Sequence, residues 1–198
     1  MRTCDPKRGQ QILDAAAQLF ATHRYHEVRM EDIAAHAGVA KGTIYRYFHD
    51  KEDLYLALTM HGMARLFEES KSKIIGPDHP QKKLRDFLTH IVRFHEKFPY
   101  FLELIQRIEL SGSIASNNAL QGVRTQFFHL LTGLITQLND AGVTATPYPE
   151  LTALALMGII RSILRSTPQP WPPYLADWIV HQFMHGASAS APPSRSTT

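Results

Sequence analysis

The residue types best suited to chemistry stand close together between positions 41 and 47, where the sequence reads KGTIYRY. Lysine and arginine neutralise phosphate charge, and threonine and tyrosine hydroxyls hydrogen-bond phosphate oxygens or base edges. A glycine in such a segment removes a side chain where a backbone approaches a duplex. The composition therefore predicts a surface that contacts nucleic acid. Its candidate contact residues are Lys41, Gly42, Thr43, Tyr45, Arg46 and Tyr47.

Two short helices must position these side chains, and the sequence predicts both. Ile33 and Ala37 recur at helical spacing, and Gly38 then interrupts the pattern where the chain needs a positive φ. Ile44 and Phe48 are four residues apart, so they share the inner face of the following helix. The pattern is typical of a helix-turn-helix whose second helix is short enough to lie in a major groove.

This part of the chain resembles the TetR/AcrR family of one-component transcriptional regulators. The resemblance covers about the first 58 residues, and beyond them only length and helical character agree. The matching residues are Ile12-Leu13-Asp14-Ala15-Ala16, Leu19-Phe20, Ile33-Ala34, Ala37-Gly38-Val39, Lys41-Gly42-Thr43, Tyr45, Tyr47-Phe48 and Asp50-Lys51-Glu52-Asp53-Leu54.

The resemblance implies a regulator, most readily a repressor, that binds a near-palindromic operator in double-stranded DNA as a homodimer. It also implies release by a small-molecule effector that is largely apolar and can be anionic. A dimer places its recognition helices one DNA turn apart, ~34–36 Å, or somewhat farther. A regulator that acts without an effector, or as an activator, is the alternative.

Several residues differ from the family pattern, and two others at the start of the fourth helix have specific expected roles. Arg29 stands where a hydroxyl residue is usual, so it either binds phosphate or faces solvent, and Arg46 reads a guanine edge or binds a phosphate. Lys51 opens the next helix, whose N-terminus favours phosphate. Asp50 should cap the amide of Asp53. Arg24 replaces a glycine, so it either adopts a left-handed conformation or the turn is built differently.

Composition argues against a disulfide-stabilised protein and against a membrane-spanning one. The chain has 198 residues and one cysteine, Cys4, which excludes an internal disulfide framework and fits a reducing cytosol. The longest apolar region, 151–164, is shorter than the ~18 residues of a membrane span. We therefore expect a cytoplasmic protein with no membrane partner. Residues 1–55 contain eight basic and eight acidic side chains, so a phosphate-binding surface depends on their placement.

The helical patterns predict an all-α fold of about nine helices. A three-helix DNA-binding domain should occupy residues 1–50, a helical effector-binding and dimerisation domain residues 51–186, and a disordered tail residues 187–198. The expected helices cover 6–23, 30–37, 41–48, 51–72, the segment from Pro80 to Phe98, 99–111, 117–140, 149–166 and 173–185.

Phenylalanine is concentrated in the middle of the chain, since seven of the ten lie between Phe67 and Phe128. A helical-bundle core accounts for them, and the resemblance offers an effector cavity as the alternative. An arginine there could pair with an anionic effector group. The candidate lining residues are His61, Arg65, Phe67, Phe94, Phe98, Phe101, Leu102, Ile105, Arg124, Phe127 and Phe128, with Arg93, His95, Gln106 and Arg107 as further polar candidates.

The last two expected helices combine small, branched and aromatic residues, which suits a helical dimer contact. The resemblance implies such a contact, and closure of the monomer core is the alternative. The candidate interface residues are Leu151, Leu154, Ala155, Gly158, Ile159, Ser162, Trp178, Ile179 and Phe183.

Enzyme chemistry has little support in the sequence. Asp177, His181 and His185 have a spacing that can chelate a metal ion, but ordinary surface histidines explain the same pattern. No glycine-rich phosphate loop or Gly-x-Ser-x-Gly elbow is present. We therefore expect no catalytic residue, no resident metal and no cofactor.

Overall fold

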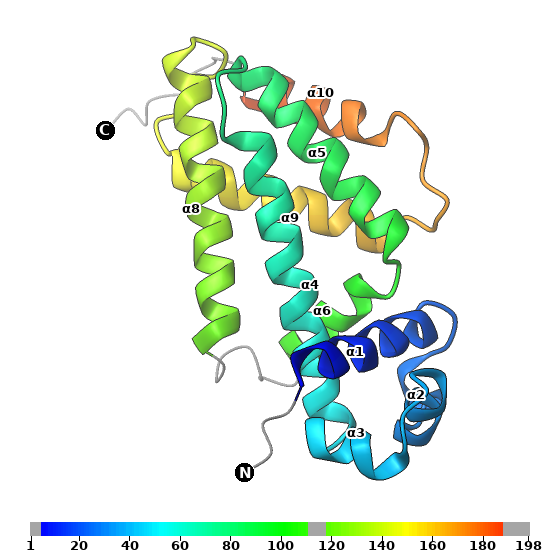
Figure 1. Cartoon of the computed structure of the whole chain (residues 1–198). Helices are drawn as coiled ribbons and strands as arrows, with labels where there is room; N and C mark the ends of the chain where they lie inside the picture. Colours follow the sequence, from blue (N-terminus) through cyan, green and yellow to red (C-terminus); the bar gives the residue numbers. More distant parts are fainter. Residues whose placement is uncertain (1–4, 111–117, 188–198) are drawn as a thin grey trace, which may run out of the picture. The chain divides into compact units, whose positions relative to one another are not determined.

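The computed structural model describes residues 5–110 and 118–187, and their regular structure is helical (Figure 1). Nine α-helices and one short 3-10 helix lie within these two ranges, so the expected all-α fold is confirmed. Cys4 and residues 188–198 of the expected tail lie outside the described residues. The elements are α1 (Pro6–Phe20), η1 (Tyr25–Glu27), α2 (Met30–His36), α3 (Lys41–Tyr47), α4 (Lys51–Ile74), α5 (Pro80–Lys97), α6 (Phe101–Leu110), α8 (Asn118–Asp140), α9 (Pro149–Ser166) and α10 (Leu175–Ala187).

Helix α1 begins at a conventional cap and ends earlier than expected. The carboxylate of Asp5 accepts a hydrogen bond from the backbone N–H of Lys7 at 3.0 Å, and proline follows at the first helical position. The helix ends at Phe20 because the N–H of Thr22 turns back to the carbonyl of Leu19 at 3.1 Å. The remaining residues to position 23 form this turn.

The turn after α1 is built without a left-handed residue. Arg24 adopts an extended conformation, with φ −70° and ψ 153°, so the left-handed alternative for Arg24 is wrong. Its backbone N–H donates to the carboxylate of Glu27 at 2.8 Å. This bond closes η1, a 3-10 helix that the periodicity of apolar residues did not predict because it is only three residues long.

Helices α2 and α3 meet through the expected glycine turn. Gly38 has φ +64°, and the next residue, Val39, donates its N–H to the carbonyl of Ala34 at 2.9 Å. Ile33 and Ile44 are both completely buried between these helices. The turn and these two side chains fix the angle at which α3 leaves α2.

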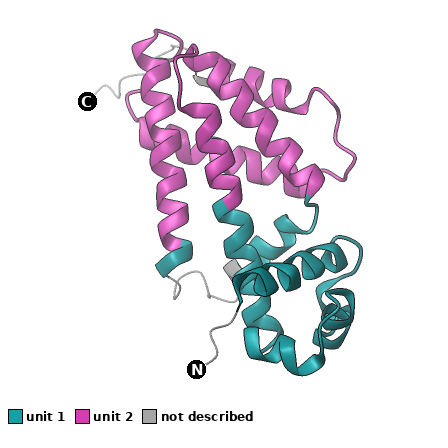
Figure 2. Ribbon diagram, in the orientation of Figure 1, with its two compact units in different colours: residues 1–64, 98–120 teal, residues 65–97, 121–198 magenta. Residues whose placement is uncertain are grey.

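The chain divides into two compact units, drawn in teal and magenta in Figure 2. Unit 1 comprises residues 1–64 and 98–120, and unit 2 comprises residues 65–97 and 121–198. The division between these units falls inside α4. Helix α6 belongs to unit 1, together with the three N-terminal helices.

Unit 2 is a helical core built on α5, α8, α9 and α10. Leu84, Leu131 and Ile179 come from three of these helices and are completely buried. Helix α5 packs on α10, and Arg85 and Asp177 join the two helices with an ion pair of 3.2 Å. None of the described helices is both long enough and apolar enough to cross a membrane.

Candidate nucleic-acid interface

Helix α3 is held by its inner face and exposes most of the predicted contact residues. Ile44 is completely buried, and Phe48, just after the helix, is 8% exposed. Their burial turns the rest of the helix toward solvent. Lys41, Gly42, Tyr45 and Arg46 are exposed, and Thr43 and Tyr47 are half-buried.

Glu31 on α2 is a charged neighbour of this surface that the sequence analysis missed. Its carboxylate pairs with the ammonium of Lys41 at 2.7 Å and accepts a bond from the hydroxyl of Tyr45 at 3.4 Å. The bond from Lys41 is the main cause that lowers the pKa of Glu31, and Glu31 in turn raises the pKa of Lys41. Both partners are exposed, so the pair adds little stability but orients both side chains. The only sequence feature that could have indicated this role of Glu31 is its position in the first turn of α2.

Arg46 and Tyr47 at the end of α3 have different surroundings. The guanidinium carbon of Arg46 lies 5.7 Å from the centroid of the Tyr47 ring. That ring also lies against α1, since a Cβ added at Gly9 would be 3.5 Å from Cδ1 of Tyr47. Tyr47 therefore packs α3 on α1 as well as facing outward.

Gly42 and Arg29 are both accessible. A Cβ added at Gly42 would meet no atom within 4 Å, so packing does not require a glycine there. Arg29 is exposed just before α2, and its backbone N–H donates to the carboxylate of Asp32 at 2.8 Å. This bond satisfies the first turn of α2 and does not involve the guanidinium of Arg29.

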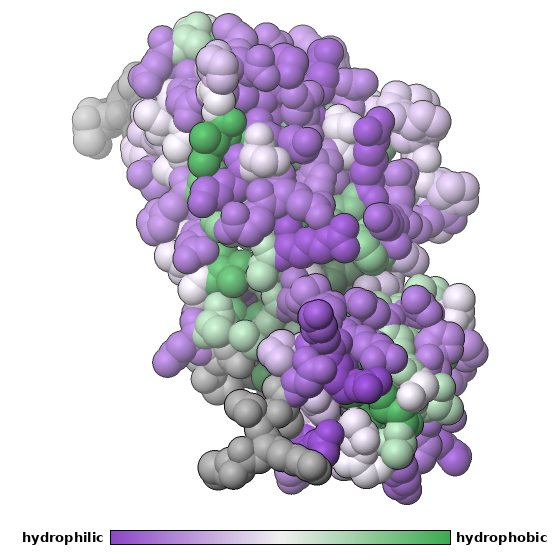
Figure 3. Space-filling model, in the orientation of Figure 1, coloured by the Kyte–Doolittle hydropathy of each residue, from purple (hydrophilic) through white to green (hydrophobic). Residues whose placement is uncertain are grey.

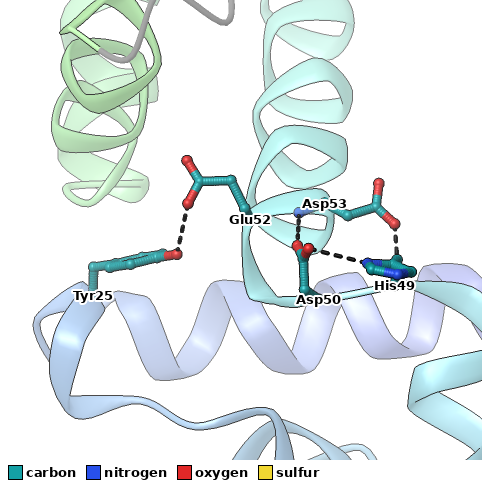
Figure 4. Close-up of polar contacts among 5 residues, drawn as sticks. All are labelled: Tyr25, His49, Asp50, Glu52 and Asp53. Atoms are coloured by element: carbon teal, nitrogen blue, oxygen red, sulfur yellow. Dashed lines mark hydrogen bonds and ion pairs between the residues drawn. The ribbon is translucent and has the colours of Figure 1, made fainter.

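The start of α4 carries a reciprocal cap, which Figure 4 shows in close-up. Asp50 accepts a bond from the N–H of Asp53 at 2.8 Å, as predicted, and Asp53 accepts one from the N–H of His49 at 2.9 Å. The backbone N–H of Asp53, and then the imidazole of His49, lower the pKa of Asp50. The cap fixes the short link between α3 and α4.

Lys51 is placed differently from the α3 residues. Its ammonium donates to the carbonyl oxygen of Tyr25 and lies 3.9 Å from the centroid of the Tyr25 ring. Burial, and then the charge of Arg107, lower the pKa of Lys51. The structure therefore brings Lys51 to η1, although the sequence analysis expected it to bind phosphate.

The expected effector-lining residues of unit 1 lie on α4, on α6 and, for Phe98, just before α6. Phe101 is 1% exposed, and a Cβ added at Gly62 would come within 2.3 Å of its ring. This distance shows that α6 packs directly on the backbone of α4. His61 is exposed beside Gln10, with 3.4 Å between its Nε2 and the amide nitrogen. Phe98, Leu102 and Ile105 are half-buried.

The expected lining residues of unit 2 are partly brought together. The ring centroid of Phe127 lies 5.9 Å from that of Phe67 and 6.0 Å from that of Phe87, so α4, α5 and α8 share an aromatic cluster. Arg65 is exposed and bonds to Glu69 at 2.7 Å. Phe94 is buried, and Arg124 and Phe128 are half-buried.

Three buried polar atoms in unit 2 were not anticipated. Ser70 Oγ, His90 Nε2 and Thr132 Oγ1 have no hydrogen-bond partner among the described residues. The last two belong to α5 and α8, and Ser70 lies one turn after Phe67 on α4. Buried polar groups are normally paired, so these atoms are suited to a polar group of a bound molecule or to water. His90 also lies 3.6 Å from the carboxylate of Glu69.

The candidate dimer residues divide between surface and core. Leu151 is 61% exposed, Leu154 52% and Trp178 45%, so α9 and α10 both expose large apolar side chains. Ala155, Gly158, Ile159 and Ser162 are exposed on the same face of α9. Ile179 and Phe183 are buried, so they close the core of unit 2. The face of the molecule drawn in Figure 3 is mainly hydrophilic, with hydrophobic residues in separate patches.

The residues on α10 whose spacing suggested a metal site make other contacts. Asp177 pairs with Arg85, and a ring nitrogen of His185 lies 3.1 Å from one of His181. Within residues 5–110 and 118–187 no three or more histidine, cysteine or acidic side chains are grouped to hold a metal ion.

A short helix that exposes lysine, arginine and tyrosine after a glycine turn defines a helix-turn-helix DNA-binding protein. Comparison with known families agrees, because the family described as "Bacterial regulatory proteins, tetR family" matches residues 12–58. The HTH-type transcriptional repressor BepR of Brucella suis is 30% identical over 155 residues, which cover 74% of this chain and 73% of that protein. The chain belongs to the TetR family of transcriptional regulators.

Two further comparisons give lower sequence identities. The fatty acid metabolism regulator protein of Bacillus subtilis is 28% identical over 136 residues, covering 67% of this chain and 68% of that protein. The crystal structure of the regulator FadR from Bacillus subtilis in complex with stearoyl-CoA matches with a TM-score of 0.74. That match covers 89% of this chain and 98% of the other at 23% identity, so it demonstrates the shared fold.

Proposed function

We propose that the protein is a repressor that binds a near-palindromic operator as a homodimer and is released by a small, largely apolar effector. The observation that carries this proposal is the exposed surface of α3, which is anchored from behind by the buried Ile44. The relative BepR is named as a transcriptional repressor, which supports repression over activation.

The exposed face of α3 and the residue before α2 make the DNA contacts. Lys41 and Arg29 bind phosphates, and Thr43 and Tyr45 hydrogen-bond phosphate or base edges. Arg46 reads a base or binds phosphate. Gly42 and Tyr47 complete the contact surface, since Gly42 leaves room for the backbone to approach the duplex. Lys51 is omitted because its ammonium lies on Tyr25.

The homodimer forms through α9 and the exposed part of α10. Leu151, Leu154 and Trp178 expose large apolar surfaces that gain free energy when a second copy covers them. The small residues Ala155 and Gly158 beside them allow close approach of a partner helix. A two-fold dimer places the same face on both subunits, which matches a palindromic operator.

The effector binds in unit 2, where the rings of Phe67, Phe87 and Phe127 offer an apolar surface. Ser70 and His90 then supply polar atoms for the effector's polar group. Long-chain acyl-CoA is the first class of effector to test. One relative is named a fatty acid metabolism regulator, and FadR was solved in complex with stearoyl-CoA.

Operator release tests the effector directly. A labelled operator fragment is bound to the protein and titrated with acyl-CoAs of increasing chain length, with free CoA as the control, while fluorescence anisotropy reports the bound fraction. The proposal predicts release by long-chain acyl-CoA and none by free CoA. Phe127→Ala should weaken release without weakening operator binding. Persistent binding with every acyl-CoA would exclude this class of effector.

A further inference from the structure

We propose that Lys51 and Arg107 are positioning residues: they hold Tyr25 between α4 and α6, and thereby orient the recognition helix α3 without touching DNA. The proposal rests on operator binding by α3. It gives Lys51 a role different from the phosphate contact expected from the sequence, and gives Arg107 a role outside an effector pocket.

Both cations lie over the same aromatic ring. The ammonium of Lys51 is 3.9 Å from the centroid of the Tyr25 ring, and the guanidinium carbon of Arg107 is 3.7 Å from it. These separations are well within the range of cation–π attraction, about 6 Å. Lys51 also donates to the backbone carbonyl of Tyr25, so it holds both the ring and the main chain of η1.

Tyr25 is held by further contacts from α1 and α4. Its ring centroid is 4.6 Å from that of Tyr55 in an edge-to-face arrangement, and 6.0 Å from that of Phe20 with the rings nearly parallel. Its hydroxyl donates to the carboxylate of Glu52 at 3.3 Å, the contact drawn in Figure 4. Burial, and then the charge of Glu52, raise the pKa of Tyr25, so the ring is neutral and donates at neutral pH.

Placing two cations beside one ring costs electrostatic energy, and the surrounding groups offset it. Arg107 is among the causes that lower the pKa of Lys51, so the two cations disfavour each other. The electron-rich face of Tyr25, its carbonyl oxygen and the charge of Asp32, which raises the pKa of Lys51, provide the opposing attraction. Lys51 is half-buried in this arrangement, and Arg107 reaches the ring from an exposed position on α6.

The position of Lys51 in the chain connects this contact to α3. Lys51 is the first residue of α4, and α3 ends at Tyr47. The link between them is short and fixed, because Phe48 is 8% exposed and Asp50 caps α4. A change in the position of Tyr25 relative to Lys51 therefore shifts the start of α4 and, with it, α3.

The salt dependence of DNA binding separates a positioning residue from a phosphate contact. Each phosphate contact contributes about 0.9 to the slope of log K against log salt concentration, because a bound counterion is released. A residue that acts through Tyr25 contributes nothing to this slope. The two roles therefore predict different results for the same substitution.

The experiment measures operator affinity across a range of salt concentrations for the wild type, Lys51→Met, Arg107→Met and the control Lys41→Met. We expect Lys51→Met and Arg107→Met to weaken binding about three- to thirtyfold, the equivalent of a lost cation–π contact, with an unchanged slope. Lys41→Met should reduce the slope by about 0.9. A comparable reduction in Lys51→Met or Arg107→Met would overturn the proposal. Unchanged affinity in both variants would also overturn it.

A double-mutant cycle tests whether the cations act through Tyr25. In a Tyr25→Leu background, Arg107→Met should have little further effect, and Lys51→Met should have a reduced effect, because the bond of Lys51 to the backbone carbonyl at position 25 remains. In a Tyr25→Phe background, which keeps the ring, both substitutions should retain their full effect. Additive losses would overturn the proposal. The same cycle is also measured on the unfolding free energy, which does not depend on DNA. If the wild-type protein selects no operator, the proposed function is refuted. If the cycle shows no coupling between Tyr25 and the two cations, the role of Tyr25 is refuted.

Discussion

Glu31 orients two of the side chains that we propose as DNA contacts. It pairs with Lys41 at 2.7 Å and accepts from the hydroxyl of Tyr45 at 3.4 Å. Both contacts hold the side chains over α3, but the carboxylate also opposes an approaching phosphate. The residue types on α3 were predictable from their chemistry. Their link to Glu31 was not, because it depends on the angle between α2 and α3.

Replacing Glu31 should therefore strengthen DNA binding. We expect Glu31→Gln to raise affinity for DNA of any sequence by up to about fivefold, the scale of an exposed ion pair. Glu68→Gln, an exposed site on α4, makes the same change in net charge and serves as the control. Filter binding at low salt measures both. Equal gains in the two variants would mean that net charge alone is responsible.

Gly62 is required by packing rather than by conformation. An added Cβ would lie 2.3 Å from Cε2 of the buried Phe101. Gly62→Ala should lower the unfolding free energy by about 1–3 kcal/mol through overpacking. Gly133→Ala on α8, where a Cβ meets no atom within 4 Å, should instead leave stability unchanged or raise it by about 0.5–1 kcal/mol. Urea denaturation measures both, and equal effects would contradict this account.

At the scale of the elements, sequence patterns located most helices and failed where an end depended on local hydrogen bonds. Helix α9 covers Pro149–Ser166, as expected, because proline marks its start and the apolar pattern is continuous. Helix α1 ends three residues early, and η1 was missed. Both features depend on bonds from backbone N–H groups, one to the carbonyl of Leu19 and one to the side-chain carboxylate of Glu27, which no periodicity reveals.

Helix α5 contains a buried histidine that should make stability depend on pH. His95 is 5% exposed, its Nδ1 lies 2.8 Å from the carbonyl of Ile91, and burial lowers its pKa. Because the folded state disfavours the charged form, the unfolded state binds more protons below about pH 6.5. The stabilising contribution is therefore present above that pH and is lost as the pH falls toward the lowered pKa.

Denaturation between pH 8 and pH 5 checks this expectation. The unfolding free energy of the wild type should fall as the pH decreases, and the fall should be smaller in His95→Leu. His90, whose pKa burial also lowers, accounts for part of the remaining dependence. Replacing the exposed His129 with leucine provides the control. A wild-type stability that does not change over this range would be inconsistent with a neutral, buried His95.

At the scale of the whole molecule, the sequence could not predict how the candidate effector-lining and dimer residues are distributed. The expected effector-lining residues divide between unit 1, with Phe101, and unit 2, with Phe67 and Phe127. Similarly, Leu154 and Trp178 are exposed, whereas Ile179 and Phe183 are buried. Apolar residues on one helix look alike in sequence, and only packing decides which face the core.

The exposed face of α9 should control assembly. Leu154→Glu places a charge on a side chain that is 52% exposed, so it should prevent dimerisation without disturbing the core. Light scattering after gel filtration should give the mass of a dimer for the wild type and of a monomer for Leu154→Glu. The control, Gln126→Glu on the exposed surface of α8, should remain dimeric. Dimers in all three proteins would exclude this face as the interface.

The proposed function requires that α3 selects a specific DNA sequence. The most direct test incubates the untagged protein with fragments of the source genome at moderate salt and sequences the bound DNA. The measurement is repeated with Lys41→Ala plus Tyr45→Ala, which changes only exposed residues of α3. The account predicts enrichment of a near-palindromic site by the wild type and its loss in the double variant. Enrichment that survives in the variant, or no selective enrichment by the wild type, would contradict it.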